Sequence, residues 1–73
     1  MSAWNQILTS EEIAAHYALT AKIDPSFAAR DRAFYESRTA LQLSTLAAQA
    51  WDCCEPTSYQ MARSYAAKLQ GGI

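Results

Sequence analysis

The sequence TALQLSTLAAQAWDCC, residues 39–54, decides the fold that we predict. Its polar side chains recur every three or four residues, as positions on one face of an α-helix do. With the arginine that precedes the stretch, they are Arg38, Gln42, Thr45, Gln49 and Asp52. Most of the remaining circumference is apolar, so such a helix needs cover on more than one side.

The helix that contains this stretch is predicted to begin at Pro25, after Asp24 as its N-cap. No glycine or proline interrupts the chain from there until Pro56. Because these residues are the strongest helix breakers, we predict one helix of up to about 28 residues, or about 42 Å at 1.5 Å per residue. In its charged first half, Arg32 and Glu36 are four residues apart and are placed to pair.

A shorter helix is predicted before it, from Ser10 to Ala21 or Lys22. Thr9 is its expected N-cap, and Glu12 at the third helical position completes a capping box. Its apolar stripe is Ile13, Tyr17 and Ala21.

A third helix is predicted after Glu55, in one of two registers. Thr57 as N-cap with Gln60 at the third position gives a capping box, whereas Pro56 at the first helical position gives the alternative. Gly71 and the glycine that follows it are expected to end the helix. Its core-directed residues are expected to be Tyr59, Ala62, Tyr65, Ala66 and Leu69, with Met61 beside them.

The composition agrees with an all-α fold, because alanine supplies fifteen residues and valine none. We therefore predict a single helical domain over residues 1–73, with a long central second helix and shorter first and third helices packed antiparallel on it. A chain of 73 residues buries a small core. Because two short helices cannot shield the apolar half of the central helix, we expect a homodimer. The expected dimer contacts are Leu43, Leu46, Ala47, Ala50 and Trp51.

The sequence offers no constellation for catalysis or for a cofactor. His16 is the single histidine, and Cys53 and Cys54 are adjacent, without the spacing of a zinc site. We expect both cysteines to be buried free thiols at a helix end. No glycine occurs before residue 71, so no loop resembles a phosphate cradle. We expect neither enzymatic activity nor a metal or cofactor.

The formal net charge is −1, and the pI is about 5.6. This balance lacks the basic excess that nucleic-acid-binding proteins usually carry. No apolar run approaches the length of a membrane span, and residues 1–8 lack the pattern of a secretory signal. We expect a cytoplasmic protein without a membrane partner.

The segment Leu8–Ala14 resembles the opening helix of helix-turn-helix and excisionase-type modules. This resemblance implies a small DNA-binding regulator as the alternative function, with Arg30, Arg32 and Arg38 on the following helix. The segment Thr20–Asp24 is longer than the turn of that family, and two acidic residues interleave the arginines.

The leading prediction is a non-enzymatic protein–protein interaction module that binds its partner stoichiometrically as a regulator, inhibitor or assembly factor. Alanine-rich proteins of this size are often accessory products of bacteria, phages or plasmids. Trp, Tyr and Arg dominate binding hot spots. The candidate partner-binding residues are Trp4, Arg30, Arg32, Phe34, Tyr35 and Arg38.

Overall fold

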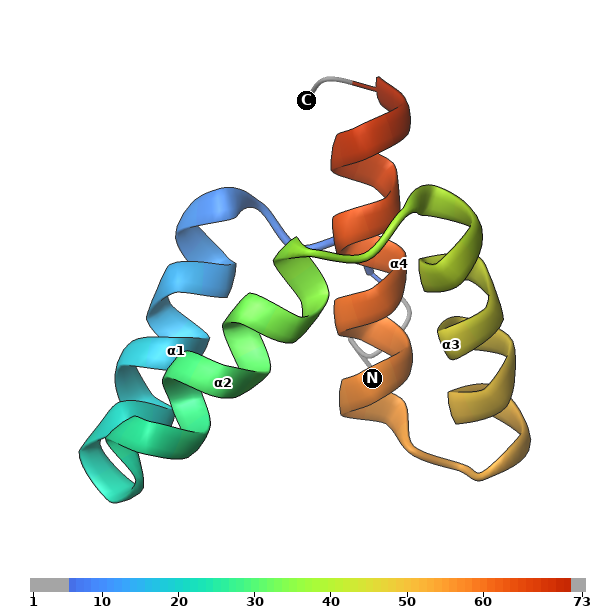
Figure 1. Cartoon of the computed structure of the whole chain (residues 1–73). Helices are drawn as coiled ribbons and strands as arrows, with labels where there is room; N and C mark the ends of the chain where they lie inside the picture. The colour runs from blue at the N-terminus through green and yellow to red at the C-terminus, as the bar shows by residue number, and fades with distance from the viewer. Residues whose placement is uncertain (1–5, 72–73) are drawn as a thin grey trace.

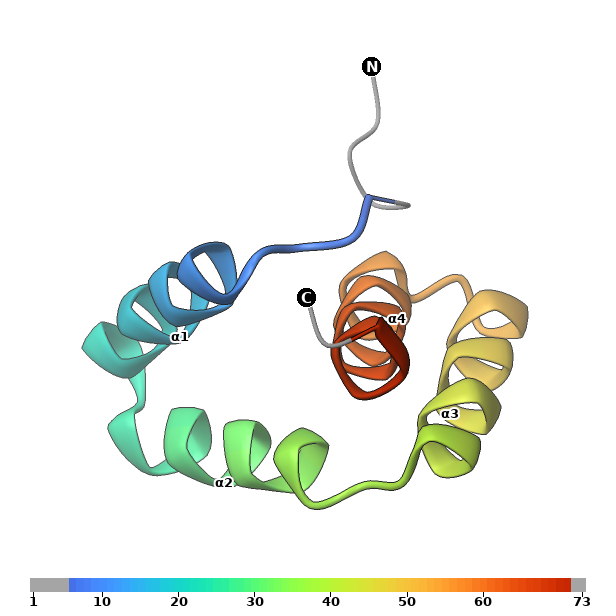
Figure 2. The same cartoon turned by 90° about the horizontal axis from the view of Figure 1, so that it is seen from above.

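The computed structural model describes residues 6–71, and within that range the chain forms four α-helices and no strand. They are α1 (Ser10–Ile23), α2 (Pro25–Glu36), α3 (Ala40–Asp52) and α4 (Pro56–Gly71). α1 and α2 form one antiparallel hairpin, and α3 and α4 form a second (Figure 1). Seen from above, α4 stands inside an arc made by the other three helices (Figure 2). None of these four helices has the length and apolar character needed to cross a membrane.

The prediction of three helices is wrong, because the long second helix is divided into α2 and α3. The segment between them, Ser37–Thr39, is called the elbow below. Thr39 is extended (φ −78°, ψ 166°), and its hydroxyl accepts a hydrogen bond from the Gln42 N–H at 3.1 Å. In return, the Gln42 side-chain carbonyl accepts from the Thr39 N–H at 2.9 Å. This capping box satisfies donors at a helix start, so the chain breaks there with neither glycine nor proline.

The other predicted helix starts are confirmed. The Thr9 hydroxyl accepts from the Glu12 N–H at 3.1 Å, and the Glu12 carboxylate accepts from the Thr9 N–H at 2.8 Å. The Asp24 carboxylate accepts from a backbone N–H in the first turn of α2 at 3.0 Å, and Pro25 begins that helix. Pro56 likewise begins α4, which selects the second of the two predicted registers.

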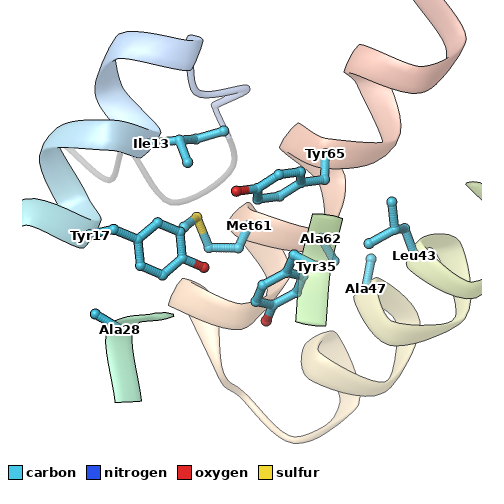
Figure 3. Close-up of a cluster of buried hydrophobic side chains, with 9 residues drawn as sticks. All are labelled: Ile13, Tyr17, Ala28, Tyr35, Leu43, Ala47, Met61, Ala62 and Tyr65. Carbon is cyan, nitrogen blue, oxygen red and sulfur yellow. The ribbon is translucent and has the colours of Figure 1, made fainter. Parts of the chain in front are cut away.

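The core lies between the two hairpins and on both sides of α4 (Figure 3). Tyr35 of α2 stacks on Tyr65 of α4, with ring centroids 5.7 Å apart and planes 7° apart. The burial of Ile13 and Tyr17 confirms the predicted stripe of α1 at these two positions. The core cluster consists of Ile13, Tyr17, Ala28, Tyr35, Leu43, Ala47, Met61, Ala62 and Tyr65.

On α4, the predicted core residues Ala62 and Tyr65 are buried, as is Met61 beside them. Leu69, also predicted on this face, is exposed instead. The last turns of α4 extend beyond the neighbouring helices (Figure 1), and Leu69 is 60% exposed.

The apolar half of the predicted central helix is only partly covered within one chain. Leu43 is fully buried, and Ala47 and Ala50 are buried with it, because α3 packs along α4. As folded, these three side chains are not available as the dimer contacts that the sequence suggested. Leu46 is half-buried and Trp51 is 56% exposed. Self-association therefore stays a prediction with only these two of its five expected contacts accessible.

Hydrogen bonds tie the start of the chain to α4. The Leu8 N–H donates to the Ser64 hydroxyl at 2.8 Å, and that hydroxyl donates to the Gln60 carbonyl at 2.7 Å. The Lys68 ammonium donates to the Ser10 hydroxyl at the start of α1. These bonds satisfy the buried Ser64 and hold the first hairpin against α4.

Candidate partner-binding site

Residues 6–71 contain no group of three His, Cys, Asp or Glu side chains close enough to hold a metal ion. The single histidine, His16, is half-buried, and its ring meets Tyr17 edge-on with centroids 5.0 Å apart.

An open hollow of about 330 Å³ lies where α2 gives way to α3. Phe34 at the end of α2 is 41% exposed there, and Leu41 at the start of α3 is 78% exposed. This hollow is called the elbow groove, and it is lined by Phe34, Arg38, Leu41, Gln42, Thr45 and Leu46.

Arg38 is the one charged side chain that lines the elbow groove. Its guanidinium carbon lies 4.8 Å from the centroid of the Phe34 ring, within the range of a cation–π contact. Its Nη2 donates to the Ser37 hydroxyl at 3.1 Å, and that hydroxyl donates to the Phe34 carbonyl at 3.0 Å. The Arg38 Nε is buried and has no hydrogen-bond partner. The guanidinium is thus held in place from one side and lacks an acceptor on another.

The structure brings Phe34 and Arg38 together, and the Tyr35 ring meets the Phe34 ring edge-on with centroids 5.3 Å apart. Arg32 pairs with Glu36 at 3.0 Å, as predicted, and lies over the Tyr17 ring at 5.8 Å. Arg30 Nε donates to a carbonyl of its own helix at 3.4 Å. Trp4 lies outside the described residues.

Tyr35 does not belong to a binding surface, contrary to the prediction. It is only 8% exposed and is stacked on Tyr65 in the core. Helical geometry explains the contrast with its neighbour, since adjacent positions differ by about 100° around the axis. Phe34 therefore faces outward while Tyr35 faces α4.

The sequence prediction missed Leu41 and Gln42 as residues of the site. In a continuous helix, Gln42 belongs to the polar stripe and Leu41 to the apolar surface that needs cover. The signal that reveals them is the pattern Thr39-x-x-Gln42, which is a capping box. Once α3 starts at this box, Leu41 stands in its first turn beside the elbow.

A second open hollow, of about 490 Å³, lies at the turn between α3 and α4. Trp51 and Tyr59 contribute rings with centroids 5.2 Å apart. The turn also contains Cys53 and Cys54, which are exposed rather than buried as predicted. Cys54 adopts a left-handed conformation (φ 56°) that turns the chain out of α3, so both thiols lie outside the core.

A third exposed apolar group lies at the turn between α1 and α2. It is called the hairpin tip and consists of Leu19, Ile23 and Phe27. Ile23 is 89% exposed. The hairpin tip is exposed like the elbow groove. It differs because no arginine stacks on its side chains as Arg38 does on Phe34.

The three core tyrosines are not acid–base groups at neutral pH. Burial raises the pKa of Tyr17, Tyr35 and Tyr65 above the usual value for a phenol. For Tyr17, a hydrogen bond from its hydroxyl to the Asp31 carboxylate at 2.8 Å raises the pKa further. All three therefore stay neutral and serve as packed rings.

No family model matches the chain, and no curated protein or solved structure is significantly similar to it.

Proposed function

We propose that the protein is a non-enzymatic interaction module that binds another protein stoichiometrically through the elbow groove. The observation that carries the proposal is Arg38 stacked on Phe34 at the rim of an open hollow, with Leu41 exposed beside them. Aromatic and arginine side chains in concave apolar settings are the ones that dominate protein–protein binding energies.

The fixed position of Arg38 supports this proposal further. An arginine on an open surface loses rotamer freedom when a partner binds, and that loss weakens the complex. Here the Phe34 ring and the Ser37 hydroxyl already hold the guanidinium. Because the fold already restricts the Arg38 side chain, a partner that contacts it causes a smaller loss of side-chain entropy.

We propose that the protein acts by occupying part of its partner's surface. A protein of 8.1 kDa that covers part of a partner's surface can block another contact or stabilise an assembly. Regulator, inhibitor and assembly factor are three outcomes of the same binding event.

The DNA-binding alternative has less support. The resemblance makes α2 the recognition helix, with Arg30 and Arg32 on it and Arg38 just after its end. Arg32 is paired with Glu36 at 3.0 Å, and an acidic side chain beside an arginine opposes contacts with phosphate groups. We therefore propose a protein partner and include DNA as an outcome of the test.

Affinity capture from the native host, with identification by mass spectrometry, tests the proposal. The test variant is Leu41→Ser, and the matched control is Ile23→Ser at the hairpin tip, which removes an even more exposed apolar side chain. We expect the wild type and Ile23→Ser to retain one stoichiometric protein, and Leu41→Ser to lose it by about tenfold. Circular dichroism should give the same helix content for all three.

Two results contradict the proposal. One is a partner that both variants retain equally, since the elbow groove is then not the binding site. The other is captured material that nuclease treatment removes, since the partner is then a nucleic acid.

A further inference from the structure

We propose that Cys53 and Cys54 form a binding site for a trivalent arsenic compound that carries one aromatic substituent. The two thiols bind the arsenic atom, and the hollow beside Trp51 and Tyr59 receives the substituent. This site lies at the opposite end of α3 from the elbow groove, so it is independent of the proposed function.

The turn after α3 holds both thiols at the surface. The Glu55 N–H donates to the Ala50 carbonyl at 2.9 Å, and the Cys54 N–H donates to the Trp51 carbonyl at 3.2 Å. These two bonds form a Schellman motif, in which the residue at the position of Cys54 is left-handed and is usually glycine. Cys54 has a φ of 56°, and both cysteines are free and exposed. The motif therefore presents two adjacent thiols to solvent on a hydrogen-bonded section of backbone.

The peptide bond between the two cysteines opposes a disulfide between them. No peptide bond in residues 6–71 is cis, so the two Cα atoms are about 3.8 Å apart. Unstrained disulfides join residues whose Cα atoms are about 4.4–6.8 Å apart. A further atom placed between the two sulfurs lengthens the bridge and enlarges the ring, which relieves this constraint. The pair is therefore better suited to hold one atom between both thiols than to close on itself.

The number of donors indicates which atom the pair binds. A structural zinc ion takes four protein ligands. Residues 6–71 place no cluster of three His, Cys, Asp or Glu side chains where it could hold a metal ion. Trivalent arsenic forms three bonds and prefers sulfur, so two thiols complete its set when the third bond goes to an organic substituent. Cys53 and Cys54 thus match monosubstituted arsenic(III) in the number and the softness of their donor atoms.

The binding step is a condensation that changes no oxidation state. An organoarsenic(III) oxide reacts with the two thiols, each of which attacks as its thiolate after it gives up its proton. The arsenic–oxygen double bond and two S–H bonds break, and two arsenic–sulfur bonds form. The oxygen leaves with both protons as water, and the arsenic stays trivalent. The step therefore needs neither an oxidant nor a reductant.

The neighbouring hollow indicates what the substituent is. The Trp51 and Tyr59 rings have centroids 5.2 Å apart, and Trp51 is 56% exposed. An aromatic ring on an arsenic atom held by Cys54 can pack against them, and such ring pairs are stabilising beyond the area that they bury. The hollow therefore favours a phenyl substituent over a methyl one. Its volume is about 490 Å³, and its lining consists of Ala50, Trp51, Cys54, Glu55, Pro56 and Tyr59.

Intact-mass spectrometry and competition measure the binding with the full-length, reduced protein. The probes are phenylarsine oxide and methylarsine oxide. The variants are Cys53→Ser, Cys54→Gly and Trp51→Ala, each checked for helix content by circular dichroism. Cys54→Gly removes a thiol and places glycine at the left-handed position, which glycine adopts without a steric penalty, so this variant keeps the fold.

We expect the wild type to bind one phenylarsine per chain, to retain it in excess 2-mercaptoethanol and to release it to ethane-1,2-dithiol. Cys53→Ser and Cys54→Gly should each bind it about 100-fold more weakly, because the second bond is no longer formed within one molecule. The wild type should prefer the phenyl form over the methyl form by about tenfold, and Trp51→Ala should lower this preference to about twofold. Equimolar Zn²⁺ should not displace the phenylarsine.

Four results overturn the inference. Equal binding by the wild type and either single-thiol variant means that the second thiol takes no part. Displacement by equimolar Zn²⁺ means that the pair serves a metal ion with further ligands. Equal affinity of the wild type for the phenyl and methyl forms means that the hollow does not receive the substituent. Conversion of the pair to an intrachain disulfide in an equimolar mixture of reduced and oxidised glutathione means that the peptide bond does not oppose closure.

Discussion

Leu41 and Leu43 lie two residues apart on α3 and have opposite environments. Leu43 is fully buried against α4, whereas Leu41 is 78% exposed beside the elbow. The inner face of α3 thus contributes to the core, and the outer face contributes to the elbow groove. Two leucines in one helix therefore have different roles. The packing of α4 on one side of α3 decides which of them is buried.

The largest predicted effect separates these two leucines by stability. We expect Leu43→Ala to lower the free energy of unfolding by about 2–4 kcal/mol, because it leaves a cavity under α4. Leu41→Ala should change it by less than about 0.5 kcal/mol, as exposed substitutions usually do. Urea unfolding followed by circular dichroism measures both. Equal losses would mean that Leu41 is covered in solution, and the elbow groove would not exist as described.

A second prediction concerns the tyrosines on the inner side. Because burial raises the folded-state pKa of Tyr17, Tyr35 and Tyr65, the folded state holds these protons more tightly than the unfolded state. Their contribution to stability is therefore complete below about pH 10, the unfolded value, and is lost as the pH rises above it. Each strongly shifted tyrosine should cost up to about 1.4 kcal/mol per pH unit.

Urea unfolding at pH 9, 10 and 11 measures this dependence. Tyr17→Phe is the control, since it removes one titrating phenol and should flatten the alkaline loss. A free energy of unfolding that stays constant up to pH 11 would refute the role of these buried phenols.

The smallest predicted effect tests the capping box that divides α3 from α2. Thr39→Ala removes the hydroxyl that accepts from the Gln42 N–H, and it should cost about 1 kcal/mol. Thr57→Ala is the matched control, because α4 begins at Pro56 and leaves Thr57 inside its first turn. The control should cost no more than about 0.3 kcal/mol. Equal effects of the two changes would show that the box does not stabilise the start of α3.

Much of the local structure was predictable from short sequence patterns. The Thr9 capping box, Asp24 before Pro25 and the Arg32–Glu36 pair all depend on residues within four positions of each other. Interactions at such short range are the same in almost any tertiary context. The all-α class was predictable for a similar reason, since alanine and leucine favour helix at each position separately.

The break at the elbow was within reach of the sequence but was outweighed by a weaker argument. The absence of glycine and proline between Pro25 and Pro56 favours one helix. A capping box at Thr39 competes with continuation of that helix. Which conformation forms depends on whether packing α3 beside α4 lowers the free energy more than extending α2 into solvent does. Short-range helix propensity carries no information on that difference in free energy.

The sequence by itself determined where α1 and α2 start, that Arg32 pairs with Glu36, and that the chain is helical over most of residues 10–71. Only the tertiary structure decided that α3 folds back along α4, so that Leu43, Ala47 and Ala50 are buried in one chain while Phe34, Arg38 and Leu41 share an exposed hollow. The physical reason is the distance along the sequence over which each kind of interaction acts. Caps and ion pairs are local free energies, whereas burial depends on which distant helix covers a given face.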